Sequence, residues 1–390
     1  MDPAQEAQAG VRDVVVVGAG PAGAAAAIAA REAGADVLLL EREELPRYKL
    51  CGGGLLQVSV DSLPAGFAPP LRARVDRVSF THAGRGARER RAARPGQPVL
   101  RMVYRREFDH ALVRHAAGLG VEVRDRCTVR AIAEDDGVVE LTTSGGPVRA
   151  RAVVGADGSA GRSSRWVGAR FDQVDVGLEV ELALDDARRE AWRGRVHLDW
   201  GPLPGSYGWA FPKGDQLTVG VILDRDRGAE GRGYLADLVR WLDLDDAPVV
   251  SRGGHLTHCR ADGSPLARGR VLLAGDAAGL LEPWTREGIS FALRSGRLAG
   301  AAAARTAAGA DPAAVGDAYT RDIEAGLGAE MRAGRSCLQA FERRPGWFHH
   351  LLAGTGAGWA VFCRLTEGRT TFPRLVRHRT VRVALALARR

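Results

Sequence analysis

The sequence predicts an α/β protein in which a Rossmann-like dinucleotide-binding unit carries an inserted antiparallel-sheet domain and a helical C-terminal part. Three observations predict this architecture. A β-branched apolar run over residues 13–17 leads directly into a glycine-rich turn and an alanine-rich helix, which is the order of a βαβ unit. Residues 61–104 and 176–260 alternate apolar and polar side chains, as half-buried strands do. Residues 290–342 are rich in alanine and predict helices.

The composition is that of a globular protein with more than one domain. The chain has 390 residues, of which 45% are hydrophobic and 26% charged, as is typical of soluble domains. This length corresponds to two or three units of about 100–200 residues each. The net charge of +8 comes almost entirely from arginines spread among acidic neighbours, and no nucleic-acid-binding motif is present. We therefore expect no nucleic-acid partner.

Cysteine usage and the N-terminus indicate the compartment. The five cysteines are scattered and form no C-x-x-C pair, which predicts neither a disulfide framework nor a metal site and favours a reducing environment. Residues 1–6 lack the basic start of a signal peptide. No uninterrupted apolar run reaches the ~20 residues of a membrane span. We expect a cytoplasmic protein, with peripheral contact to the inner face of the membrane as a second hypothesis.

Each part of the N-terminal βαβ unit has a predicted role in dinucleotide binding. Gly18 makes the tight turn, Gly20 lets the backbone approach a pyrophosphate, and Gly23 allows close packing of helix on strand. The helix N-terminus directs its positive dipole end at the phosphates. A second apolar run, residues 37–40, ends in Glu41, whose carboxylate can accept both ribose hydroxyls. The alternative is a glycine-rich turn in an unrelated α/β core. The predicted contacts from this unit are Gly18, Gly20, Ala22, Gly23, Glu41 and Arg42.

Three later segments favour FAD over NAD. Residues 153–159 form an apolar strand that ends in a Gly-flanked Asp, and residues 270–279 form another that runs into Gly-Asp. Residues 105–112 open a helix with Arg105, which can reach a phosphate or the flavin chain. No second G-x-G-x-x-G with a downstream acid follows, so we expect one tightly held dinucleotide. The reductant, NAD(P)H or another external donor, would bind without a Rossmann domain of its own.

With the glycine-rich start, these segments resemble the flavoprotein hydroxylase superfamily, whose FAD-binding domain is of the glutathione-reductase-2 type. The resemblance implies that Asp276, after Gly275, hydrogen-bonds the ribityl chain of FAD, and that Asp157 supports the pyrophosphate region. It also implies that Gly288 and Ile289 begin a helix at the pyrimidine edge of the flavin. A helix N-terminus there stabilises the anionic reduced flavin.

Two further motifs resemble the geranylgeranyl reductase family. Residues 46–55 read PRYKLCGGGL and residues 207–215 read YGWAFPKGD. The family has P-R-x-K-x-C-G-G-G-L beside the flavin and Y-x-W-x-F-P-K on the substrate sheet. The only two lysines of the chain, Lys49 and Lys213, fall inside these motifs. Members of this family saturate C=C bonds of long isoprenoid chains. The resemblance therefore implies an FAD-dependent reductase that transfers hydride from reduced flavin and adds a proton.

These motifs supply the candidate catalytic and substrate-binding residues. Tyr207, Trp209 and Phe211 alternate, so on a strand they face one side, where they suit a flavin or a polyprenyl chain; packing into a core is the alternative. The resemblance implies that Cys51 lies beside the isoalloxazine, whereas an isolated cysteine is commonly a small buried hydrophobe. The predicted catalytic residues are Lys49, Cys51, Tyr207 and Trp209; further flavin contacts are Cys51, Gly52 and Gly53; and substrate contacts are Gly54, Tyr207, Trp209, Phe211 and Trp284.

The proposed chemistry requires an acid as well as a hydride. An isolated alkene is not electrophilic, so hydride attack needs protonation of the less substituted carbon. The site would hold an acid on one side of the chain and flavin on the other, with water excluded. Candidate acids are Cys51, Tyr207 or a water held by Lys49.

One segment departs from the family pattern. The family usually has T-G-E-G-I before the last flavin-contacting helix, whereas this chain has Arg286 in place of the first glycine, within residues 285–289. Two interpretations follow. Either the arginine stabilises a flavin anion, or the loop has a different shape.

The remaining expectations concern domain boundaries and the C-terminus. Residues 347–362 are apolar and aromatic, long enough to roof a lipid tunnel. Residues 374–390 are basic and amphipathic, which is typical of a solvated helix or, alternatively, of a membrane-surface segment. His255 and His258 lack a metal-type partner and are expected at the surface or in the core. We expect a discontinuous FAD-binding domain at 1–75, 101–175 and 262–320, a substrate sheet domain at 76–100 and 176–261, and a helical region at 321–390.

Two other functions stay open at this point. An FAD-dependent monooxygenase or halogenase of a small aromatic or secondary-metabolite substrate shares the fold, and residues 207–212 half resemble the halogenase W-x-W-x-I-P stretch. A flavin-bearing protein without turnover belongs to a different class. The sequence leaves open which isoprenoid is reduced and the oligomeric state.

Overall fold

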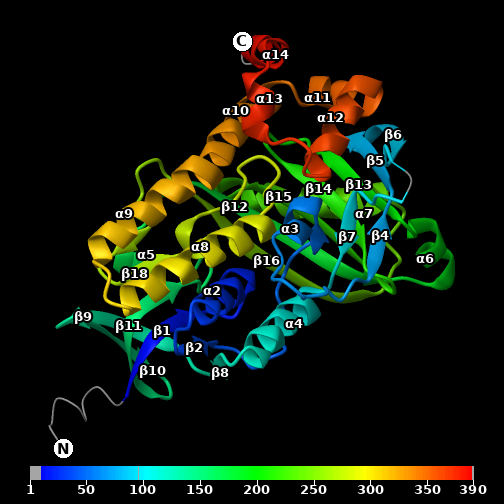
Figure 1. The fold of residues 1–390 in the computed structure, drawn as a ribbon. Coiled ribbons are helices and arrows are strands. Elements are labelled where there is room, and N and C mark those ends of the chain that lie inside the picture. The colour runs from blue at the N-terminus through cyan, green and yellow to red at the C-terminus, as the bar shows by residue number, and fades with distance from the viewer. Residues whose placement is uncertain (1–9, 95, 389–390) are drawn as a thin grey trace, which may run out of the picture.

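The structure is a computed structural model that describes residues 10–94 and 96–388. It has the expected fold class, with two large sheets, helices packed on both, and a helical C-terminal region (Figure 1). The residues on which the signal-peptide expectation depends, and the last two arginines of the basic C-terminal segment, lie outside the described residues.

The first sheet has eight strands around a parallel core, in the order β17-β18-β11-β1-β2-β8, with β10 paired to β11 and β9 to β10. The β1, β2, β8, β11 and β18 strands run parallel, as in a Rossmann-like unit. The bounds are β1 (Val11–Val17), β2 (Val37–Leu40), β8 (Glu122–Arg124), β9 (Val129–Asp135), β10 (Val138–Thr143), β11 (Gly146–Gly155), β17 (Ala267–Arg268) and β18 (Val271–Leu273).

Two helices with small side chains pack closely on this sheet (Figure 1). Helix α2 (Pro21–Glu32) follows β1, and α8 (Ile289–Ala307) lies against it. A Cβ at Gly296 of α8 would lie 2.1 Å from Ala22 O, and one at Gly300 would lie 2.1 Å from Ala26 O. The two helix backbones therefore approach to a distance that only glycine permits.

The second sheet has seven strands in the order β16-β12-β15-β14-β13-β5-β6. All neighbours are antiparallel except β13 and β5, which pair in parallel. One face packs on α6 (Asp186–Trp192) and α7 (Gly228–Trp241). The bounds are β5 (Arg77–His82), β6 (Arg85–Arg91), β12 (Phe171–Ala183), β13 (Arg195–Trp200), β14 (Tyr207–Pro212), β15 (Gln216–Asp224) and β16 (Val249–Arg260).

The C-terminal helices cover the opposite face of this sheet near β5, β13 and β14 (Figure 1). Trp359 Nε1 donates to Arg91 O at 2.8 Å and Arg90 Nε donates to Ala353 O at 2.7 Å, so side-chain hydrogen bonds fasten these helices to β6. They are α10 (Ala329–Arg343), α11 (Pro345–Gly354), α12 (Gly356–Thr366), α13 (Phe372–Arg377) and α14 (Arg379–Ala388). No helix among the described residues is both long and apolar enough to cross a bilayer.

The remaining elements connect these layers. A small sheet, β3-β7-β4, is formed by segments that connect strands of one large sheet to strands of the other along the chain. Three of the domain boundaries expected from sequence fall inside continuous elements, because β7 runs through residues 100–101, β12 through 175–176 and α9 through 320–321. The bounds are β3 (Gly54–Leu55), β4 (Ala73–Val75), β7 (Leu100–Met102), α3 (Gln57–Asp61), α4 (Arg105–Gly118), α5 (Arg162–Val167), α9 (Pro312–Ile323), the 3-10 turns η1 (Arg225–Arg227) and η2 (Gly275–Ala278), and the π-helical turn η3 (Glu324–Gly328).

Candidate active site

One large cavity, of about 1660 Å³, extends from the β1–α2 turn across the second sheet to the C-terminal helices. It brings together nearly all the residues singled out from sequence. Gly23 and Gly275 do not line it and lie behind its wall, against Gly18 and Ala22 respectively. The predicted residues that line it are Gly18, Gly20, Ala22, Glu41, Arg42, Lys49, Cys51, Gly52, Gly53, Gly54, Arg105, Asp157, Tyr207, Trp209, Phe211, Asp276, Trp284, Gly288 and Ile289.

The β1–α2 turn fits a dinucleotide pyrophosphate. Gly18 has φ +101°, a left-handed conformation suited to glycine, and a Cβ at Gly23 would lie 1.7 Å from Gly18 O. Helix α2 begins at Pro21 with Gly20 as N-cap, and no side chain of the described residues caps it. The N–H groups at this end are therefore available to an anion.

A buried ion network borders this turn. The Glu41 carboxylate accepts hydrogen bonds from Ala19 N at 3.0 Å and from Arg47 Nε at 3.1 Å. Arg47 also pairs with Asp109 at 3.3 Å, and Arg105 binds Asp109 through both carboxylate oxygens at 2.8 and 2.9 Å. The arrangement supplies a carboxylate for ribose and a guanidinium for phosphate at one end of the cavity. The cofactor set predicted from sequence did not include Arg47.

The two later aspartates lie on the same side of the cavity. Asp157 Oδ2 accepts from Arg162 N at 2.7 Å and from Ser163 N at 3.1 Å, so it caps α5. Its Oδ1 is buried without a hydrogen-bond partner in the described chain, which leaves one carboxylate oxygen for a ligand. Asp276 lies in η2, directly after β18. This set of groups fits the ribose, pyrophosphate and ribityl parts of FAD.

The glycine triplet lines the cavity, and neighbouring protein atoms occupy the space that side chains at Gly52 and Gly53 would need. A Cβ at Gly52 would lie 2.9 Å from Phe211 Cδ2, and one at Gly53, which has φ +74°, would lie 2.2 Å from Val103 O. Cys51 precedes the triplet, and Gly53 N donates to its Sγ at 3.4 Å. Burial opposes the charge of Arg105, but Asp109 and the nearby Cys51 sulfur outweigh it and raise the Arg105 pKa. The thiol therefore lies beside a permanent cation.

Both lysines lie at this loop, and each contacts a titratable group. Lys49 Nζ is 2.7 Å from His255 Nε2, and Lys213 Nζ donates to Cys51 O at 3.1 Å and to Glu181 Oε1 at 3.2 Å. Burial lowers the pKa of Lys49. Burial and the Lys49 charge lower the pKa of His255 to about 4, so at neutral pH the ring is neutral and accepts from the ammonium. A lysine ammonium can also release this proton, whereas an arginine guanidinium cannot.

Besides Arg47, two further cavity residues were not predicted from the sequence. His255 was expected at the surface or in the core, but it lies on the cavity wall. Glu179 also lines the cavity, and its Oε1 is buried with no partner in the described part of the chain. Burial raises the Glu179 pKa to about 7, against the opposing charge of Lys213. The partner of each lies far away in the sequence: His255 contacts Lys49, and the charge of Lys213 acts on Glu179.

Strand β14 forms an aromatic wall. Its rings follow one another at centroid distances of 5.9 Å from Tyr207 to Trp209 and 6.4 Å from Trp209 to Phe211. Gly220, opposite Trp209 on β15, leaves room for the indole, because a Cβ there would lie 2.2 Å from Trp209 Cζ2. The Tyr207 hydroxyl donates to Thr285 O, and burial raises its pKa, so this proton is firmly held.

Beyond the aromatic wall the cavity is apolar. Trp284 packs against Phe341, Phe348 and Phe372 at centroid distances of 5.7, 5.3 and 5.9 Å. Helices α11 to α14 line this arm with side chains that include Leu351, Leu352, Val361, Phe362, Leu365, Leu375, Val376, Val381 and Leu385. One end of the cavity therefore suits a polar dinucleotide and the other an apolar chain; hereafter the second is called the apolar arm.

Comparisons with known proteins identify the family of this chain. A family model of the FAD binding domain matches residues 12–195. Digeranylgeranylglycerophospholipid reductase 1 of Methanopyrus kandleri is 33% identical over 314 residues, which cover 74% of this chain and 79% of the relative. Menaquinone reductase of Mycobacterium tuberculosis is 33% identical over 310 residues, which cover 74% and 75%.

Solved structures share the fold. A geranylgeranyl bacteriochlorophyll reductase-like protein from Thermoplasma acidophilum has a TM-score of 0.76 at 19% identity, over 92% of this chain and 97% of its own. The flavin-dependent brominase Bmp2 has a TM-score of 0.71 at 20% identity, over 96% and 98%. At these identities the likeness concerns the fold alone, whereas the relatives of higher identity are isoprenoid and quinone reductases by name. The chain belongs to the geranylgeranyl reductase family of FAD-dependent oxidoreductases.

Proposed function

We propose that this protein uses FAD to saturate C=C bonds in the isoprenoid chain of a lipid or quinone. The observation that carries this proposal is the continuity of one cavity from the Glu41 end to the apolar arm. A small aromatic substrate would need no such arm. The relatives named for a digeranylgeranyl lipid and for menaquinone support a chain-bearing substrate of this class.

Different parts of the cavity would hold the flavin ring, guide the chain and exclude water. Bound FAD, once reduced by NAD(P)H or another external donor, supplies the hydride. Gly52, Gly53 and Gly54 line the cavity where the flat ring would lie, and Gly54 with β14 borders the path of the chain. The aromatic wall and the apolar arm exclude water, which strengthens electrostatic interactions during transfer.

The proton has two well-placed sources. Cys51 lies beside the cation of Arg105 and lines the cavity. Lys49 shares a short hydrogen bond with neutral His255 and can hold a proton or a water in the cavity. Tyr207 is the weaker candidate, because its hydroxyl proton is engaged by Thr285 O. We assign proton donation to Cys51 and proton supply to Lys49.

The position of the apolar arm suggests how a lipid enters. Trp347 lines the cavity and is 40% exposed, and Val383 of α14 is 53% exposed. Helices α13 and α14 carry Arg374, Arg377, Arg379 and Arg382 with no acidic residue. Exposed apolar and cationic side chains in this combination favour peripheral contact with an anionic bilayer surface.

A single-turnover experiment tests the proposal. The purified holoprotein is reduced without oxygen and mixed with a geranylgeranyl-bearing lipid, and flavin reoxidation and product mass are followed together. We expect reoxidation matched by saturation of the chain. Flavin that stays reduced until oxygen enters, with an oxygenated or halogenated product, would support the monooxygenase or halogenase instead.

A further inference from the structure

Arg286 occupies a backbone position that favours glycine. Its φ is +53°, in the left-handed region that L side chains rarely adopt. The resemblance to the geranylgeranyl reductase family implies a glycine at this position. Glycine adopts this conformation freely, whereas the arginine is held in it at a local conformational cost.

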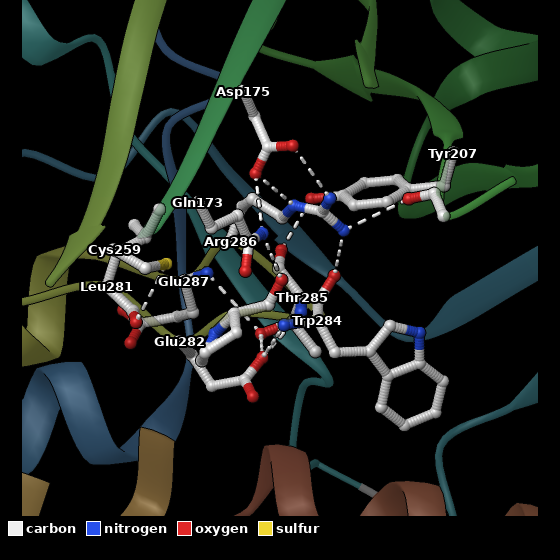
Figure 2. A network of polar contacts seen from close by, with 12 residues as sticks. Gln173, Asp175, Tyr207, Cys259, Leu281, Glu282, Trp284, Thr285, Arg286 and Glu287 are labelled. Atoms are coloured by element: carbon white, nitrogen blue, oxygen red, sulfur yellow. Dashed lines mark hydrogen bonds and ion pairs between the residues drawn. The ribbon is translucent and has the colours of Figure 1, made fainter. Parts of the chain in front are cut away.

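The added side chain is completely engaged within the protein (Figure 2). Arg286 Nε and Nη2 bind the two carboxylate oxygens of Asp175, each at 3.1 Å, and Nη1 donates to Gly205 O at 3.1 Å and Trp284 O at 2.8 Å. The two charged side chains are only 5% and 3% exposed. Because Asp175 neutralises it at close range, the guanidinium is not a free cation for a flavin anion. This favours a structural explanation of the substitution over the electrostatic one.

The loop held by Arg286 joins the two ends of the cavity. Trp284 lies in the aromatic cluster of the apolar arm, and Gly288 precedes α8 at the cofactor end. Thr285 O accepts a hydrogen bond from the Tyr207 hydroxyl, and the Arg286 guanidinium lies 6.0 Å from the Tyr207 ring centroid. Arg286 thus fixes, through Trp284 and Tyr207, two aromatic side chains that border the route between the ends.

We propose that Arg286 is a positioning residue that sets the width of this route and so determines which double bonds of the chain reach the flavin. Arg286, Tyr207 and Trp284 all line the cavity, so a glycine at 286 would add the vacated space to the route. A narrower route holds the chain in one register and restricts the number of bonds saturated. This inference rests on the proposed function.

The test compares holoprotein variants with and without the Arg286–Asp175 ion pair. R286G removes the guanidinium but leaves the Asp175 carboxylate buried without its counter-ion, which destabilises a fold. The double variant D175N/R286G removes both charges. R260Q/E324Q is the matched control, because buried Arg260 forms an ion pair with the partly exposed Glu324 and neither residue lines the cavity. FAD content and thermal unfolding report whether each variant is folded.

Geraniol, farnesol and geranylgeraniol are the probes, with kcat and KM for each and the mass of every product. We expect D175N/R286G to change the ratio of kcat/KM between geranylgeraniol and geraniol by about 10-fold and to yield products with additional saturated bonds, with FAD content unchanged. R260Q/E324Q should keep the wild-type ratio and products. A wild-type ratio and product pattern in folded D175N/R286G would overturn the role of Arg286. Wild-type protein that saturates neither these alcohols nor the geranylgeranyl-bearing lipid of the single-turnover experiment would instead refute the proposed function.

Discussion

Gly220→Ala tests whether the aromatic wall controls the chemistry. Gly220 does not line the cavity, so the added methyl group affects the cavity only by displacing Trp209, which lies opposite it on β14. Its Cβ would lie 2.2 Å from Trp209 Cζ2 and 2.6 Å from Cε2. Carbon atoms in contact lie about 3.5–4.0 Å apart, so the indole must move by about 1.5 Å toward the cavity. We expect overpacking to reduce the free energy of unfolding by about 1–3 kcal/mol.

The larger effect should fall on turnover. A misplacement of about 1 Å near reacting groups costs on the order of 100-fold in rate, so chain reduction should fall by about that factor while FAD content stays at the wild-type level. Urea unfolding, flavin absorbance and single-turnover kinetics measure the three quantities. Gly233→Ala on α7 is the matched control, because no atom apart from its chain neighbours and the adjacent backbone of its own helix lies within 4 Å of the added Cβ; it should raise stability by up to ~1 kcal/mol and leave turnover unchanged. Wild-type turnover and stability in Gly220→Ala would refute the reasoning.

Three further predictions follow from the packing and charges. Gly23→Ala places a Cβ 1.7 Å from Gly18 O, so it should distort the phosphate turn and yield protein without bound flavin, measured by absorbance; a yellow, fully loaded variant would contradict this. Lys49→Arg keeps the charge but cannot release its proton, so it should retain FAD and slow single-turnover chain reduction by about 100-fold; an unchanged rate would exclude Lys49 from proton supply. Burial lowers the pKa of His197 to about 4, against about 6.5 when unfolded. Stability should therefore be full above pH 6.5 and fall by about 3 kcal/mol as pH decreases to 4; His197→Gln should lose this slope in urea titrations, and retention of it would assign the slope to other groups.

Local sequence patterns predicted much of this molecule. The β-branched run, the glycine spacing and the terminal Glu41 specify a βαβ unit, because each acts within a few residues of the others. The alternation of Tyr207, Trp209 and Phe211 likewise placed three rings on one strand. These features depend on short-range geometry, which a single sequence contains.

The parts that sequence missed depend on long-range pairing. His255 gains its role from Lys49, 206 residues away, and Arg286 from Asp175, 111 residues away. The room that Gly220 gives Trp209 follows from the register of β14 on β15. No local pattern contains such partners, because strand order and register decide which residues meet.

The central claim is that one cavity holds FAD and an isoprenoid chain end to end. A crystal structure of the protein with FAD and a saturated geranylgeranyl analogue tests it most directly. We predict density for the isoalloxazine against the Gly52–Gly54 backbone, with the chain passing Trp209 and Trp284 into the apolar arm beneath α11 to α14. A chain bound elsewhere, with the apolar arm closed by its own side chains, would contradict it.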